Sequence, residues 1–237
     1  MKDSAVPREM QVPRAAARLT ALFCAAGALG TALFPAPQPA QAHPHVWIES
    51  KTKILFDADQ RVRALEVEWR FDEFYSIFAV EGLDANGDGR FDEPELQPLA
   101  EVNVTSLRDY RYFTYVSING GDAEYGKVVD FGSTFEDGLL SLRFVLPLAQ
   151  PVDPRVESVS FTSYDPSFYI SIDAAVDRPV TFAGPAPVGC DLHMERGGET
   201  ESLNIDEADI FDPAGFSIAA QFATRATLDC PPAVATQ

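Results

Sequence analysis

The sequence predicts a mainly β protein, namely a single-domain β-sandwich with an inserted helix–loop–helix unit. Two observations predict this class. Apolar and polar residues alternate along most of the chain, which is the pattern of half-buried strands. The alternation is interrupted between residues 71 and 107, where the apolar spacing becomes helical. The chain has 237 residues, of which 46% are hydrophobic, so it can bury a sizeable core.

The alternation is clearest in "RALEVEWRF", residues 63–71, where Leu65, Val67 and Trp69 share one face. In "SINGGDAEYG", residues 117–126, a turn is predicted at Asn119-Gly120-Gly121 between two extended runs. Three further runs repeat the alternation, with apolar faces made of Leu140, Leu142, Phe144 and Leu146, of Val159 and Phe161, and of Phe168, Ile170 and Ile172. This density of strands is typical of a sandwich.

Two helices are predicted in the interrupting segment. From Phe71 onward the apolar positions are 71, 74, 75, 78 and 79, which would form one face of a helix. A second helix is predicted from about Glu93 to Leu107. It would have Leu96, Leu99, Ala100, Asn103 and Leu107 on one side.

The loop between these helices, "DANGDGRFDEPE" at residues 84–95, has the residue pattern of an EF-hand calcium loop. Calcium prefers six to eight oxygen ligands, and alternate residues of a tight loop can supply them. Gly89 stands where the loop needs its sharp turn. The alternative is an Asp- and Gly-rich turn without an ion. The predicted ligands are Asp84, Asn86, Asp88, the carbonyl of Arg90, Asp92 and Glu95.

A solitary loop of this kind in an exported protein is more often structural than sensory. EF-hands usually occur in pairs, and the sequence contains one such loop. We therefore expect a structural Ca²⁺ with a dissociation constant on the order of 10⁻⁴ to 10⁻³ M.

Residues 1–42 have the pattern of a cleaved signal peptide. A basic start precedes "LTALFCAAGALGTALF", residues 19–34, and Ala40-Gln41-Ala42 forms a small-x-small cleavage motif. A membrane anchor is the alternative, but this apolar run is shorter than the roughly 20 residues that a span needs. We expect a periplasmic protein without stable membrane insertion, consisting of a folded domain at 43–230 and a loose tail at 231–237.

Charge and cysteine content narrow the possible partners. The leader removes four basic and two acidic residues, which leaves 14 Lys and Arg against 34 Asp and Glu, a net charge of −20. This excess of carboxylates argues against nucleic acids and anionic membranes as partners. Cys190 and Cys230 remain after cleavage, and two cysteines in an exported protein most often form a disulfide. Two buried free thiols are the alternative.

Cleavage after Ala42 would make His43 the first residue, so that its free α-amine and imidazole can chelate one metal ion. His45 adds a third nitrogen, and Pro44 excludes binding through deprotonated backbone amides because it has no amide proton. Three nitrogens suit Zn, Ni, Co or Cu. Candidates for a fourth ligand are His193 and Asp165, although an exposed histidine and a turn-capping aspartate are simpler interpretations.

Four motifs resemble one known family. "AHPHVWIE", "EWRFDEFYS", "DANGDGRFDEPEL" and "SYDPSFYI" are together similar to the exported proteins called domain of unknown function 1007. Proteins of this family are often labelled the periplasmic component of an uncharacterised ABC-type transport system, and many are encoded beside nickel/cobalt-type exporters. The resemblance implies an inner-membrane metal transporter or exporter as partner. It carries over His43 and His45, and it implies a role for Asp165 through the matching "YDPSFY" segment.

The sequence thus favours a periplasmic metal-binding accessory protein of a transition-metal transport system, and no enzyme. Hydrolase chemistry has little support, since the chain lacks a G-x-S-x-G motif and holds three histidines. One alternative is a calcium-stabilised protein-interaction module without a transition metal. Another is a copper oxidative enzyme with a histidine brace, for which His193 would have to supply the distant histidine.

Overall fold

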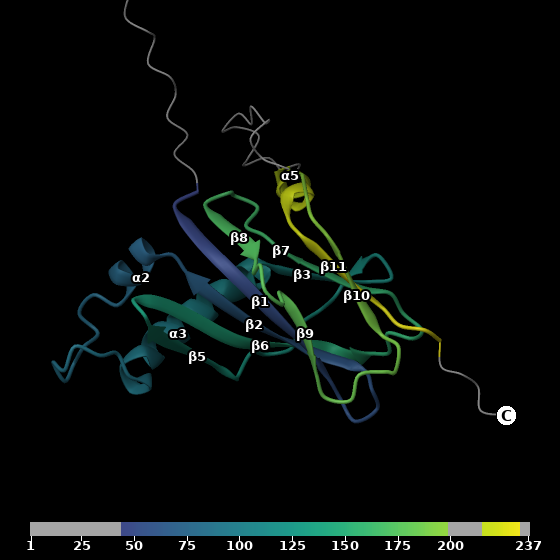
Figure 1. Ribbon diagram of the computed structural model, residues 1–237, viewed down its shortest axis with the longest axis horizontal. Coiled ribbons are helices and arrows are strands. Elements are labelled where there is room, and N and C mark those ends of the chain that lie inside the picture. Colours follow the sequence, from purple (N-terminus) through teal and green to yellow (C-terminus); the bar gives the residue numbers. More distant parts are fainter. Residues whose placement is uncertain (1–43, 199–214, 233–237) are drawn as a thin grey trace, which may run out of the picture. The chain divides into compact units, whose positions relative to one another are not determined.

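Two β-sheets carry most of the protein's structure (Figure 1). The computed structural model describes residues 44–198 and 215–232, all within one compact unit that spans 42–237. The predicted leader 1–42, His43 and residues 233–237 of the predicted tail lie outside the described residues. Within the described part, no helix is long and apolar enough to span a membrane.

The elements follow one another in chain order. The strands and helices are β1 (Val46–Phe56), β2 (Val62–Phe71), α2 (Glu73–Ala79), α3 (Glu93–Leu107), the 3₁₀ segment η2 (Arg108–Phe113), β3 (Thr114–Ile118), β4 (Gly121–Asp122), β5 (Phe131–Glu136), β6 (Leu139–Val152), β7 (Val159–Ser163), β8 (Ile170–Ala174), β9 (Val180–Ala183), β10 (Asp191–Glu195), α5 (Gly215–Phe222) and β11 (Arg225–Asp229). The mainly β class predicted from the sequence is therefore confirmed.

The first sheet, sheet A, has the strand order β5-β6-β2-β1-β8, and β9 also pairs with β1. The β5–β6, β6–β2 and β2–β1 pairs are antiparallel. β8 and β9 are both parallel to β1, and they follow one another along its free edge, β8 beside residues 46–50 and β9 beside residues 52–55. The N-terminal half of β1 is thus held from both sides, by β2 and by β8.

The second sheet, sheet B, has the strand order β10-β11-β7-β3-β4 and is antiparallel throughout. β4 has two residues and follows the predicted turn, in which Asn119 and Gly120 both have positive φ. Beyond β4, the Tyr125 hydroxyl donates to the Thr114 carbonyl and accepts the Val116 N–H. This phenol satisfies backbone groups of β3 that the short β4 leaves unpaired.

The predicted alternation decides which side chains are buried. Leu65, Val67 and Trp69 of β2 are at most 1% exposed, and they join residues of sheet B such as Val116 and Phe161 in one hydrophobic cluster. The opposite face of sheet A is charged. Opposite charges face one another there across β1 and β2, in the pairs Glu49–Arg70, Lys51–Glu68 and Lys53–Glu66.

Helix α3 has the bounds expected from the sequence, Glu93–Leu107. Asp92 caps it, accepting the Glu95 N–H, while the Glu95 side chain accepts the Asp92 N–H. Its most buried residues are Leu96, Ala100 and Val104. The predicted Asn103 is only half-buried, so the buried stripe is rotated slightly from the expected one.

Helix α2 forms where it was predicted, but only Phe71, Tyr75 and Ala79 of its predicted apolar face pack into the core. Phe74 and Phe78 point to solvent, and the fully buried residue of the helix is Ser76. The Ser76 hydroxyl donates to the Asp72 carbonyl and accepts the buried N–H of Leu140 in β6. The buried N–H of Leu140 requires an acceptor, and this requirement outweighs the apolar spacing in deciding which side of α2 faces the core.

The predicted strand around Phe168 begins later than expected. Phe168 has a positive φ of 56° and belongs to the turn before β8, which starts at Ile170. The turn follows from Asp165, whose carboxylate accepts the backbone N–H of Ser167 and of Ile170. Side chain-to-backbone hydrogen bonds of this kind compete with strand pairing.

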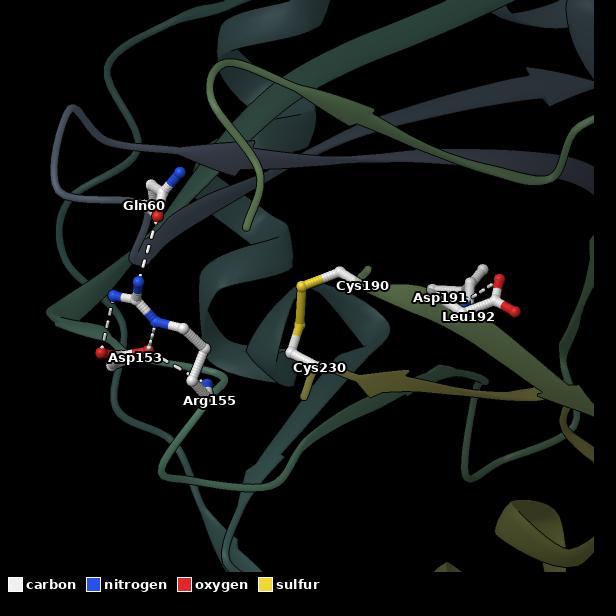
Figure 2. Close-up of a disulfide and its surroundings, with 7 residues drawn as sticks. All are labelled: Gln60, Asp153, Arg155, Cys190, Asp191, Leu192 and Cys230. Carbon is white, nitrogen blue, oxygen red and sulfur yellow. Dashed lines mark hydrogen bonds and ion pairs between the residues drawn. A yellow bond between two sulfur atoms is a disulfide. The ribbon is translucent and has the colours of Figure 1, made fainter. Parts of the chain in front are cut away.

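The predicted disulfide is present between Cys190 and Cys230. It joins the residue before β10 to the residue after β11, at one end of an edge hairpin of sheet B (Figure 2). Figure 2 also shows Arg155 held by Asp153 and Gln60. The disulfide closes a loop with a sequence separation of 40 that contains all of residues 199–214.

Replacing both cysteines by alanine should lower the free energy of unfolding by about 4 kcal/mol, because the open chain regains the entropy that a loop of this length removes. Denaturant unfolding of the two forms measures the difference. The wild type under reducing conditions should show the same loss, whereas equal stabilities with and without the bond would contradict the prediction.

Candidate functional site

The first residues of β1 are fixed by a backbone contact to the turn before β8. The His45 N–H donates to the Tyr169 carbonyl at 2.9 Å, and the parallel pairing then runs from Val46 opposite Ile170. The imidazole of His45 lies against the Tyr169 ring, with the ring centres 4.7 Å apart and the planes tilted by 38°. Although His45 is exposed, its position is thus defined by both backbone and ring contacts.

Asp165 shapes the turn that presents Tyr169. Its side chain is buried, and its oxygens accept the Ser167 N–H at 2.8 Å, the Ser167 hydroxyl at 2.7 Å and the Ile170 N–H at 3.0 Å. The carboxylate has about four acceptor sites, and these contacts occupy most of them. Asp165 is therefore a turn-capping residue that positions Tyr169, and through Tyr169 it positions His45.

Asp72 fixes β1 from the other side. Its carboxylate accepts the Trp47 N–H at 3.0 Å, and its own N–H donates to the Trp47 carbonyl at 2.9 Å. The second carboxylate oxygen accepts the Tyr75 N–H and so caps helix α2. One aspartate thus ties the start of β1 to the start of α2.

Three of the motifs found in the sequence therefore meet at one place. "AHPHVWIE" supplies His45 and Trp47, "EWRFDEFYS" supplies Asp72, and "SYDPSFYI" supplies Asp165 and Tyr169. We call this place, defined by these five residues, the β1 junction. Figure 1 shows that the start of β1 and the start of β8 lie side by side.

Aromatic side chains surround the β1 junction. Trp47 and Tyr169 are each about half exposed. Phe71, which precedes Asp72, stacks on Tyr75. Burial and the Asp72 charge raise the pKa of Tyr75. Burial also raises the pKa of Tyr115 beside Asp165, with a further contribution from the stacked Tyr164. These phenols stay protonated at neutral pH and offer no anionic oxygen to a cation.

Of the four predicted transition-metal ligands, the structure describes His45, Asp165 and His193, and it does not bring these three together. His193 lies on β10, opposite Thr227 in sheet B, with its Nε2 3.5 Å from a Glu195 oxygen. Within 44–198 and 215–232, no group of three or more His, Cys, Asp or Glu is arranged to hold a metal ion. Because His43 lies outside these ranges, His45 is the one proposed nitrogen ligand at the β1 junction that the structure describes.

The loop at 84–95 is organised by its own side-chain oxygens. Asp84 accepts the N–H groups of Gly87, Asp88 and Gly89, and Glu95 accepts those of Ala85 and Asn86. Gly89 has a φ of +76°, a conformation that a side chain would strain. The remaining loop contacts are from Asp88 to Asn86, from Arg90 to Asp88, and between Asp92 and Glu95.

These contacts turn the oxygens of the expected ligands toward the loop backbone. Each carboxylate keeps acceptor capacity after its N–H contacts, since its two oxygens have about four lone-pair sites. The donor set consists of carboxylate, amide and carbonyl oxygens, which suits a hard cation and not a soft one. The chemistry of the residues therefore fits calcium.

Sequence reasoning missed two residues of the β1 junction. Asp72 looks like an ordinary helix N-cap, and its contact to Trp47 depends on where β2 ends. Tyr169 looks like a strand residue, but it precedes β8 and faces His45. Both residues do lie inside the motifs that carry the resemblance, which is the signal that could have found them.

The fold and the β1 junction define a class of mainly β proteins with two sheets, whose first strand starts in a polar, aromatic-rimmed site. The chain belongs to the family described as "Protein of unknown function (DUF1007)", whose model matches residues 28–230.

Two relatives extend this comparison. An "Uncharacterized 15.5 kDa protein in trpE 3'region" of Spirochaeta aurantia is 32% identical over 98 residues, which cover 41% of this chain and 69% of the relative. An "Uncharacterized protein" of Haemophilus influenzae is 24% identical over 172 residues, covering 70% of this chain and 76% of the relative. Neither description states an activity.

Asp165→Ala should destabilise the protein by about 2 kcal/mol, because part-buried N–H and O–H donors of Ser167 and Ile170 lose a charged acceptor. Chemical denaturation measures the loss. Hydrogen exchange should also be faster at the His45 amide, since the Tyr169 carbonyl is no longer held. Asp173→Ala is the matched control, because Asp173 is exposed and accepts one bond from Ser171. Unchanged exchange at His45 would contradict the positioning role.

Proposed function

We propose that this protein is a periplasmic metal-binding accessory protein of a transition-metal transport system. In this proposal, signal peptidase cuts after Ala42, and the mature chain binds a zinc, nickel, cobalt or copper ion through the amine and imidazole of His43 and the imidazole of His45. Its partner is an inner-membrane metal transporter or exporter. The domain is a β-sandwich whose inserted helix–EF-hand loop–helix holds a structural Ca²⁺.

The position of His45 carries the proposal. His45 directly precedes strand β1 and is exposed to solvent. Its backbone N–H is bonded to the Tyr169 carbonyl, and its ring packs on the Tyr169 ring. A ligand whose position is fixed before binding loses less conformational freedom when it binds. Trp47, two residues further along, is held by Asp72, so a metal bound here would sit on a rigid strand end.

The other candidate ligands contribute less to the proposal. Asp165 is occupied with hydrogen bonds and supports the site indirectly through Tyr169. His193 belongs to an edge strand of the other sheet. We therefore expect three nitrogen ligands from the chain, with the remaining positions taken by water or by a partner's side chain. An open position is what a protein needs in order to pass a metal on.

The calcium-stabilised interaction module remains the second candidate function. It is favoured by the loop at 84–95, whose oxygen donors suit calcium, and by the apolar residues that α2 exposes beside it. The two candidates differ in one respect, namely whether the amino terminus binds a transition metal.

Copper(II) or nickel(II) should quench the fluorescence of mature wild-type protein, because Trp47 is two residues from His45 whereas Trp69 is buried in the core. His45→Ala should weaken this binding at least about 100-fold, since even lost supporting contacts cost 10- to 100-fold at metal sites. Fluorescence titration measures the dissociation constant. Trp47→Phe should still bind zinc by calorimetry but should lose most of the quenching.

Two controls make this test specific. A mature form whose α-amine is acetylated retains both imidazoles but not the chelating amine, so its affinity should also fall at least about 100-fold. His193→Ala should bind as the wild type does. Equal affinity in the acetylated form, or a mature protein that starts elsewhere, would rule out the amino-terminal site.

Calcium at 10 mM should raise the free energy of unfolding by about 1.4 to 2.7 kcal/mol, as expected for a dissociation constant on the order of 10⁻⁴ to 10⁻³ M. Glu95→Gln should abolish the rise, because an amide cannot act as the bidentate carboxylate. Thermal unfolding with and without calcium measures it. Asp177→Asn, a change at an exposed carboxylate outside the loop, should keep the rise, and a calcium effect that survives Glu95→Gln would exclude the loop.

A further inference from the structure

Helix α2 turns its largest apolar side chains toward solvent. Phe74 is 81% exposed, Phe78 is 69% exposed and Ile77 is 58% exposed. Positions i, i+3 and i+4 of a helix are neighbours, so the three side chains form one continuous surface, which we call the α2 patch. Figure 1 shows α2 at the margin of the described fold, beside the segment that leads to α3.

The fold holds this patch outward through contacts on the opposite side of α2. Ser76 accepts the Leu140 N–H at 2.9 Å, Tyr75 stacks on Phe71, and Asp72 caps the first turn. Rotating the helix to bury Phe74 and Phe78 would break all three contacts. The exposure is therefore a property of the packed structure and not of a loosely held segment.

The size of the patch limits what can bind it. Side chains of this size, at these exposures, present on the order of 400 Å² of apolar surface. Monomeric proteins rarely expose larger continuous apolar patches, and those of this size are often functional. A stable interface needs about 800 Å² from each partner. The patch therefore fits a short segment of a partner better than a second copy of this chain.

Charge around the patch indicates the chemistry of that segment. From residue 71 to residue 89 the chain holds five carboxylates and no lysine or arginine, and the mature chain as a whole has a net charge of −20. Glu73 and Glu81 are exposed on either side of the patch. Complementary charge steers a partner and suppresses wrong ones. A second copy and an anionic membrane are both repelled.

We propose that the α2 patch of Phe74, Ile77 and Phe78 binds a segment of a partner protein that presents apolar side chains flanked by lysine or arginine. The apolar side chains cover the patch, and the basic side chains face Glu73 and Glu81. An amphipathic basic helix has this chemistry. The inference does not depend on metal binding at His45, and it holds equally for the interaction module.

Binding of three synthetic peptides to the mature protein tests the proposal by fluorescence anisotropy. Each has roughly 18 residues, long enough to form a helix. One has leucine on one face and lysine on the other, one has glutamate in place of lysine, and one has the leucine and lysine residues in shuffled order. The ordered leucine/lysine peptide should bind at least about tenfold more tightly than the others.

Protein variants show whether the α2 patch is the surface that binds. The double substitution Phe74→Ser with Phe78→Ser should weaken the leucine/lysine peptide at least about tenfold, as expected for buried aromatic anchors. The matched control is Val176→Ser with Val188→Ser, two valines that are each 92% exposed, and it should bind as the wild type does. If circular dichroism shows that the double variant has lost helix α2, the single variants Phe74→Ser and Phe78→Ser replace it in the test. Each should bind the leucine/lysine peptide about threefold more weakly than the wild type.

Four outcomes would overturn the proposal. In the first two, the patch variants bind the leucine/lysine peptide as tightly as the wild type does, or the wild type binds the leucine/glutamate peptide as tightly as the leucine/lysine peptide. In the other two, the wild type forms a dimer in sedimentation, or floats with phosphatidylcholine vesicles, and the patch variants lose that behaviour. The last two would assign the patch to a second copy or to a lipid surface. Loss of metal binding in His45→Ala changes none of these measurements, so the two proposals fail separately.

Discussion

The hydrogen bonds that hold the start of β1 on both edges are the constraint on which the rest of the structure depends. On one edge the Tyr169 carbonyl accepts the His45 N–H, and on the other Asp72 exchanges two bonds with Trp47. Strand ends usually fray because their outer groups lack partners. Here both edges are paired, so the backbone at His45 and Trp47 is held from two sides.

The two edges link three parts of the molecule. Asp72 connects β1 to helix α2, and through α2 to the loop at 84–95. Asp165 connects β1 to the turn before β8, and Tyr164 beside it stacks on Tyr115 of sheet B. A change at either aspartate therefore affects packing at a distance. The motifs shared with the family supply these linking residues, which is a physical reason why they occur together in this chain.

Acidic charge has a different role in each part. In the loop at 84–95, carboxylates accept backbone N–H groups and leave acceptor sites for a cation. On the outer face of sheet A, Glu66 and Glu68 face basic side chains across the strands, where exposed pairs contribute at most about 1 kcal/mol. Around α2, Glu73 and Glu81 lie in the stretch 71–89, which holds no lysine or arginine, and they flank an apolar surface. The composition alone cannot separate these roles.

The sequence by itself determined the strand alternation, helix α3 and the disulfide between Cys190 and Cys230. Each follows from local periodicity or from the cysteine count of a chain expected to be exported. Only the tertiary structure decided the outward face of α2, the turn at Phe168 and the meeting of His45, Asp72 and Tyr169. Spacing grouped Phe74 and Phe78 with the buried residues of α2 because it counts apolar residues, whereas the fold had to satisfy the buried N–H of Leu140 on a strand 64 residues away. The parallel pairing of β1 with β8 joins segments more than 100 residues apart, and no local pattern encodes such a contact.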